Sequence, residues 1–215
     1  MYVYFPSCNF TRLFPELSEK VKAWMAGRGV SVTGCCRPNH KKLTDEDTPI
    51  VVCETCNIIV SENCPNLKPL SIYEYLDAIP DLPLPDHAGE TITVQDCYRA
   101  KERMAEKEAI RSLLRKMNYT IIELEGTEEE QNFDGAWLFK PVTPGNMKLA
   151  PKRFAQIEQD ILLKSPEEID AYLKNYCERF TADTVTCYCN SCYSGLKQGI
   201  GEARQVKHMI EILFA

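Results

Sequence analysis

Residues 34–56 read GCCRPNHKKLTDEDTPIVVCETC, and the rest of the chain is organised around this stretch. It begins with two adjacent thiols, Cys35 and Cys36, directly after the strand-like run VSVT. It ends with a Cys-x-x-Cys pair, Cys53 and Cys56, directly after the strand-like run PIVV. Thiolates select zinc, copper(I) and iron–sulfur clusters. The stretch therefore indicates a metal site at the ends of strands.

The adjacent thiols favour an inorganic group with several metal atoms. Zinc ligands usually lie two to four residues apart, because neighbouring side chains diverge. Two adjacent cysteines therefore suit a larger body that contains several iron atoms. A further cysteine follows the first apolar run of the chain, YVYF. The candidate ligands of this first site are Cys8, Cys35, Cys36, Cys53 and Cys56.

The composition limits the class of protein. A chain of 215 residues that is 44% hydrophobic has room for one domain or two small ones. Its net charge of −6 gives no basic field for nucleic acid. No apolar run approaches the ~20 residues of a membrane span, and the N-terminus lacks the pattern of a signal peptide. Eleven cysteines without such a signal favour metal binding or catalysis in the reducing cytoplasm over a disulfide framework.

Strand and helix patterns alternate along the first part of the chain. Short strands are expected at residues 2–5, 30–33 and 49–52, with a helix at 12–27 and a short helix at 72–79. This alternation predicts an α/β fold with mainly parallel sheets. Ligands of such sheets bind beyond the carboxyl ends of the strands, where the candidate cysteines lie.

The same pattern starts again after a proline-rich linker at residues 81–90. A strand-like run at 91–94 leads to Cys97, as the first strand of the chain leads to its cysteine. A helix pattern at 99–117 and a strand-like run at 119–124 follow. The sequence thus predicts two tandem, pseudo-symmetric Rossmann-like βαβ halves that arose by duplication.

The second half is a degenerate copy. We expect the first half at residues 1–80 and the second at 91–215, with an insertion at 129–164. The second half reads Gly-Thr-Glu where the first reads Gly-Cys-Cys, so it lacks the adjacent thiols. A helix is expected to begin after the insertion, with Ser165 as its cap and Pro166 at its first position.

Cysteines of the second half form a smaller candidate set. The pair Cys189 and Cys192 repeats the Cys-x-x-Cys of the first half, and Cys97 and Cys187 lie at strand-like runs. Four thiolates suit a tetrahedral zinc ion or a cubane iron–sulfur cluster. The other interpretation of these thiols is that they are a relic of the duplication and bind no metal.

Several residues outside the two sets are expected to be structural. Cys64 and Cys177 have no counterpart in the other half and are expected in the core or in loops. His40 is expected in a solvated loop. His208 falls within a closing helix predicted at residues 206–213, where a structural role is expected.

The cysteine pattern resembles a known family. Cys8, the GCC motif and the Cys-x-x-Cys pair, followed by a degenerate copy, resemble the cysteine-rich CCG domain. That domain occurs in heterodisulfide reductase and in related iron–sulfur components of glycolate, lactate, glycerol-3-phosphate and succinate oxidoreductases. The resemblance covers nearly the whole chain. It implies a non-cubane [4Fe–4S] cluster held by the five cysteines of one copy, with electron transfer or disulfide reduction at that cluster.

Two functions are compatible with these patterns. The first is an iron–sulfur oxidoreductase, or a component of one, that is heterodisulfide-reductase-like, serves anaerobic metabolism and acts on a small thiol or disulfide. No flavin or nucleotide motif is visible, so its electrons would come from a redox partner protein. The alternative is a zinc-stabilised binding or scaffold module without turnover.

Overall fold

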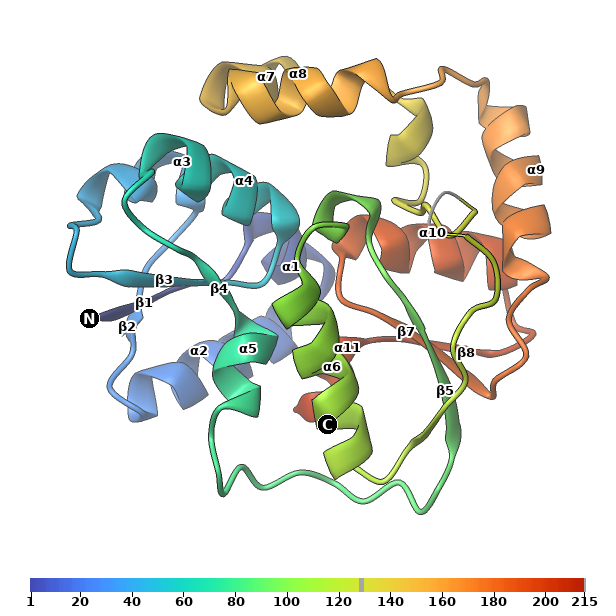
Figure 1. Cartoon of the computed structure of the whole chain (residues 1–215), viewed down its shortest axis with the longest axis horizontal. Coiled ribbons are helices and arrows are strands. Elements are labelled where there is room, and N and C mark those ends of the chain that lie inside the picture. The colour runs from blue at the N-terminus through green and yellow to red at the C-terminus, as the bar shows by residue number, and fades with distance from the viewer. Residues whose placement is uncertain (128–129, 215) are drawn as a thin grey trace. The chain divides into compact units, whose positions relative to one another are not determined.

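The computed structural model describes residues 1–127 and 130–214, and its strands form two four-stranded sheets (Figure 1). All neighbouring strands within each sheet are parallel. The strand order is β2-β1-β3-β4 in the first sheet and β6-β5-β7-β8 in the second, so the two sheets share one topology. The expected α/β fold with two Rossmann-like halves and parallel sheets is confirmed.

The chain divides into two compact units, one around each sheet. The first unit contains residues 1–78, 142–159 and 214. Among the described residues, the second contains 79–127, 130–141 and 160–213. Residues 142–159 come from the segment that the sequence suggested as an insertion in the second half, and the structure groups them with the first sheet. Part of that segment, residue 129, lies outside the described residues.

The first unit places short helices after each strand of its sheet. Its strands are β1 (Tyr2–Phe5), β2 (Ser31–Val32), β3 (Thr48–Val51) and β4 (Leu70–Ser71). Its helical segments are α1 (Cys8–Leu13), α2 (Pro15–Gly27), α3 (Cys36–Asn39), η1 (His40–Lys42), α4 (Glu54–Asn63), α5 (Ile72–Asp77), α7 (Pro144–Leu149) and α8 (Pro151–Gln159). Side chains of the central strands, among them Tyr4 and Phe5, are fully buried and form the core of this unit.

The helix expected at residues 12–27 is divided in the structure. Proline has no backbone N–H and disfavours the helical conformation in the residue before it. Phe14 precedes Pro15 and has the non-helical angles φ −133° and ψ 66°. The chain therefore ends α1 at Leu13 and begins α2 at Pro15, the favoured place for proline in a helix.

The second unit repeats this arrangement. Its strands are β5 (Thr91–Gln95), β6 (Thr120–Ile121), β7 (Thr184–Cys187) and β8 (Gln205–His208). Its helical segments are η2 (Tyr98–Ala100), α6 (Met104–Lys116), η3 (Trp137–Phe139), α9 (Pro166–Cys177), α10 (Asn190–Ile200) and α11 (Met209–Leu213). The expected start of α9 is confirmed, because the Ser165 hydroxyl accepts from the Glu168 N–H and the Glu168 carboxylate accepts from the Ser165 N–H.

The prediction of a helix throughout residues 206–213 was wrong. The chain pairs as β8 beside β7 up to His208 and only then turns into α11. The His208 N–H donates to the Glu211 carboxylate at 2.6 Å, as the Ser71 N–H donates to Glu74 at 2.8 Å in the first unit. The fourth strand of each sheet therefore ends in a helix with an acidic residue at the same offset. Within the described residues, no helix has the length and apolar character needed to cross a membrane.

Candidate metal centre

Each Cys-x-x-Cys pair lies at the N-terminus of a helix that follows a central strand. Cys53 caps α4 and Cys189 caps α10, and the second cysteine of each pair lies in the first turn. The N-terminus of a helix carries partial positive charge, which favours thiolate over thiol. Both pairs thus lie at the carboxyl ends of parallel strands, where sheets of this kind bind ligands.

In the second unit, four side chains converge on one point. One ligand atom from each of Cys97, Asp134, Cys189 and Cys192 lies within 4.8 Å of every other, and all four residues are buried. Cys97 follows β5, and the two other cysteines belong to the start of α10. Asp134 was missed by the sequence analysis, because a single acidic residue in a loop carries no periodic or spacing signal.

The spacing of these atoms suits a single tetrahedral ion. The Asp134 Oδ1 atom lies 3.6 Å from Cys189 Sγ and 3.9 Å from Cys97 Sγ. An ion with zinc-like bonds to sulfur and oxygen would separate these two ligand types by about 3.6 Å. The group can therefore hold a metal with little movement of its ligands.

A half-buried cation lies beside this group. The Arg99 Nε atom lies 2.7 Å from Asp134 Oδ2. The Ser191 hydroxyl donates to the Asp134 backbone carbonyl and fixes the loop against α10. Burial raises the pKa of Asp134 to about 7, an effect that Arg99 opposes. Three thiolates and a carboxylate around a divalent ion would leave excess negative charge, and Arg99 offsets part of it.

Without metal, the three thiols share hydrogen bonds. Hydrogen bonds from the Cys192 and Cys97 thiols lower the pKa of Cys189 well below its usual value. The pKa of Cys97 is raised well above its usual value, chiefly because its thiol donates to Cys189. Burial raises the pKa of Cys192. Cys189 is therefore the thiol of this group that most readily becomes a thiolate.

Cys187, a candidate ligand from the sequence, lies outside this group of four. It is the last residue of β7 and pairs there with His208 of β8. Its Sγ donates to the Cys189 carbonyl at 3.7 Å. Because the ligand atoms come from beyond the strand ends, a side chain within the strand ladder is not directed at the same point. His208 is fully buried, and burial lowers its pKa to about 4.

In the first unit, pairwise thiol interactions link the five candidate cysteines into a chain of sulfur contacts, but within the described residues no three of their sulfurs lie within 4.8 Å of one another. The Cys35 thiol contacts those of Cys8 and Cys36. The Cys56 thiol contacts those of Cys36 and Cys53. A hydrogen bond from Cys56 is the main cause that lowers the pKa of Cys36. The chain of contacts runs from the exposed Cys8 through Cys35, which is partly buried, to the buried Cys53 and Cys56.

The neighbourhood of these sulfurs contains a buried donor. The Tyr4 side chain on β1 is fully buried, and its hydroxyl has no hydrogen-bond partner among residues 1–127 and 130–214. Burial and the nearby Cys56 thiol raise the pKa of Tyr4. A buried hydroxyl without a partner costs about 1–3 kcal/mol. A thiolate or an inorganic sulfide at this site would supply the missing acceptor, so the surroundings of Tyr4 fit an iron–sulfur group.

The remaining residues singled out in the sequence lie apart from both sets. The Cys64 thiol donates to the His40 carbonyl at 3.5 Å. Cys177 is the last residue of α9, and burial raises its pKa to about 12. His40 was expected in a solvated loop; its side chain is instead buried, with Nδ1 at 2.9 Å from the Cys36 carbonyl oxygen. His40 therefore supports the turn that carries the adjacent thiols.

Comparisons with known proteins assign no family to the chain. No family model matches it, and no curated protein matches it. Among solved structures, it is similar to glutamate racemase isoform RacE1 from Bacillus anthracis, with a TM-score of 0.38 and 11% sequence identity. The match covers 99% of this chain and 77% of the racemase chain. A similarity of this size assigns neither a fold nor an activity.

Proposed function

We propose that the protein is an iron–sulfur redox protein whose first unit binds a non-cubane [4Fe–4S] cluster. Its ligands are Cys8, Cys35, Cys36, Cys53 and Cys56. The observation that carries this proposal is the continuous chain of sulfur contacts among these five thiols, which lie after β1, β2 and β3. The resemblance of the cysteine pattern to the CCG domain supports the same assignment.

The surrounding residues suit a group that gains and loses electrons. The cluster, when bound, supplies one-electron transfer at a potential that hydrogen bonds and burial tune. The guanidinium of Arg37 favours the thiolate form of Cys36, and its Nη2 atom donates to Asn146 Oδ1 at 2.6 Å. Cys36, Cys53 and Cys56 are buried and exclude water from one side of the group. These features favour a charged group within the unit.

The other side of the site is accessible. Cys8 is exposed and Cys35 is partly exposed. A redox partner protein can deliver electrons at this edge, and a small thiol or disulfide can approach it. None of the eleven cysteines, all of which lie within the described residues, forms a disulfide, which suits a reducing compartment such as the cytoplasm. We therefore assign the chain to electron transfer or to thiol and disulfide reduction at the first unit.

Anaerobic purification with iron and sulfide analysis tests this proposal. The parent protein should contain iron and acid-labile sulfide and should show a paramagnetic spectrum in one oxidation state. Cys36→Ser should lower the iron content or alter that spectrum. Cys64→Ser is the matched control, because Cys64 lies in the same unit but donates to a backbone carbonyl outside the sulfur chain. Equal iron content and spectra in the parent and both variants would refute the ligand assignment.

A second function, a zinc-stabilised binding module, is favoured by a different observation. The group of Cys97, Asp134, Cys189 and Cys192 has the spacing of a tetrahedral site. Asp134→Asn should weaken zinc binding by at least about 10–100-fold, since even residues that only orient metal ligands contribute that much. Cys187→Ser, which changes a buried thiol beside the group, should keep the zinc. Colourless protein with stoichiometric zinc and no iron would favour this function over the first.

A further inference from the structure

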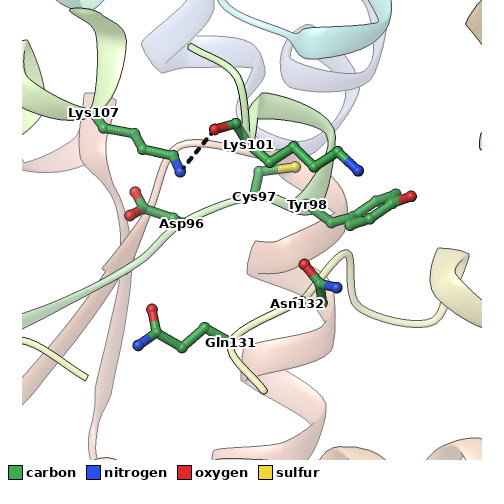
Figure 2. Close-up of a pocket in the computed structure, with 7 residues that line it drawn as sticks. All are labelled: Asp96, Cys97, Tyr98, Lys101, Lys107, Gln131 and Asn132. Atoms are coloured by element: carbon green, nitrogen blue, oxygen red, sulfur yellow. Dashed lines mark hydrogen bonds between the residues drawn. The ribbon is translucent and has the colours of Figure 1, made fainter. Parts of the chain in front are cut away.

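A hollow in the second unit adjoins the candidate metal centre. Its volume is about 230 Å³, much more than the roughly 10–15 Å³ that one water needs. Cys97 is part of its wall, and Figure 2 shows the side chains around it. The lining residues are Asp96, Cys97, Tyr98, Lys101, Lys107, Gln131 and Asn132. The hollow is therefore large enough for a small molecule and reaches a residue of the cysteine group.

The acidic residue of the hollow already has partners on other elements. The Asp96 carboxylate accepts from the Arg111 guanidinium at 3.0 Å and from the Tyr188 hydroxyl at 3.0 Å. The Gln131 amide is also engaged, because its Nε2 donates to two backbone carbonyls at 3.0 Å. The Tyr98 hydroxyl donates to Asp160. These three side chains shape the hollow but leave little capacity to bind a ligand.

The two lysines of the hollow contact a backbone carbonyl and an aromatic ring. The Lys107 Nζ donates to the Lys101 backbone carbonyl at 3.2 Å, as Figure 2 shows. The Lys101 Nζ lies 5.0 Å from the centre of the Tyr98 ring. Across residues 1–127 and 130–214, no carboxylate forms an ion pair with either ammonium group. The Asn132 amide, also in the lining, has no side-chain partner in the same residues.

We propose that this hollow is a binding site for a small organic anion whose carboxylate or phosphate groups pair with Lys101 and Lys107. Two unpaired ammonium groups bind an anionic group more strongly than a neutral one, because each bond is charge-assisted. The Asn132 amide offers a further donor and acceptor. The Tyr98 ring and the Cys97 side chain give the ligand a less polar wall. A ligand here lies beside Cys97 whatever metal the cysteine group holds.

Calorimetric titration of the full-length protein tests this proposal. The probes are succinate, inorganic phosphate and succinamide, a neutral analogue of succinate. Succinate or phosphate should bind, and added salt should weaken the binding because it screens the ammonium groups. Succinamide should not bind. The tighter of the two anions identifies which group the site prefers.

Variants locate the binding. Lys101→Gln and Lys107→Gln should each weaken binding roughly tenfold, as expected for the loss of one charge-assisted bond. Lys140→Gln, which changes an exposed lysine of the same unit outside the hollow, should leave the affinity unchanged. The proposal is overturned if neither anion binds with a Kd of about 1 mM or tighter. It is also overturned if both lysine variants of the hollow bind as tightly as Lys140→Gln.

Discussion

Tyr4→Phe should have opposite effects on the metal-free and the metal-loaded protein. The substitution removes only a hydroxyl that is fully buried and has no partner among the described residues. Since such a hydroxyl costs about 1–3 kcal/mol, its removal should stabilise the metal-free protein by roughly that amount. Each kcal/mol corresponds to about 2–4 °C in melting temperature for a chain of this size.

In the loaded protein the sign should reverse. The Tyr4 hydroxyl lies near Cys56, so a bound cluster places a thiolate or sulfide within its reach. A hydrogen bond to a charged acceptor contributes about 1.5–3 kcal/mol. Tyr4→Phe should therefore reduce retention of the cluster and shift its reduction potential downward, because the hydroxyl hydrogen bond offsets the added negative charge of the reduced state.

Tyr119→Phe is the matched control. The Tyr119 hydroxyl is also buried without a partner in the described residues, but the causes of its raised pKa are burial and Glu90, with no cysteine involved. Tyr119→Phe should therefore stabilise the metal-free and the metal-loaded protein by the same amount. The assay is anaerobic denaturation of both forms of each variant, with the reduction potential of the loaded forms. Destabilisation of the metal-free protein by Tyr4→Phe would show that the hydroxyl already has a partner. If Tyr4→Phe changed the free energy of unfolding equally in the metal-free and the loaded protein, a hydrogen bond from Tyr4 to the bound cluster would be excluded.

Two further predictions concern stability. Burial lowers the pKa of His208 from 6.5 to about 4, so the contribution of this histidine to stability is complete above about pH 6.5 and falls by roughly 3 kcal/mol as the pH drops toward 4. The urea midpoint of the parent should therefore fall relative to that of His208→Asn over this pH range. A Cβ at Gly199 would collide with the Leu173 carbonyl and lie 2.5 Å from Cys177 Sγ, so Gly199→Ala should cost about 1–3 kcal/mol in thermal denaturation. Gly27→Ala, which meets no atom within 4 Å, should be nearly neutral, and equal melting temperatures for the two variants would contradict the crowding at α9.

The sequence by itself determined the α/β class and the repeated unit. Strands and helices differ in the spacing of their apolar residues. This spacing can be read from the sequence without knowledge of the tertiary structure. The start of α9 was also readable, because Ser165, Pro166 and Glu168 form a local capping pattern. Local chemistry likewise placed each Cys-x-x-Cys pair after a strand, although the helices α4 and α10 that begin there were not predicted.

Long-range pairing was decided only by the tertiary structure. Residues 206–213 carry the pattern of a short helix, but pairing with β7 makes residues 205–208 the strand β8, since an edge of the sheet offers backbone partners there. The two halves also differ in how far the first cysteine lies beyond the end of its strand. Phe5 pairs with Val51 and Gln95 pairs with Cys187, so Cys8 lies one residue further beyond its strand than Cys97 does.

The composition of the second cysteine group was decided in the same way. Spacing selected Cys97, Cys187, Cys189 and Cys192, because cysteines in a chain are easy to recognise. The structure brings Asp134 to the group and leaves Cys187 in the β7 ladder. Asp134 meets Cys97 and Cys189 across many intervening residues, at a point where a loop passes the ends of two strands. The side chain that a loop places at such a point depends on the fold of the whole unit. No local sequence pattern predicts that side chain.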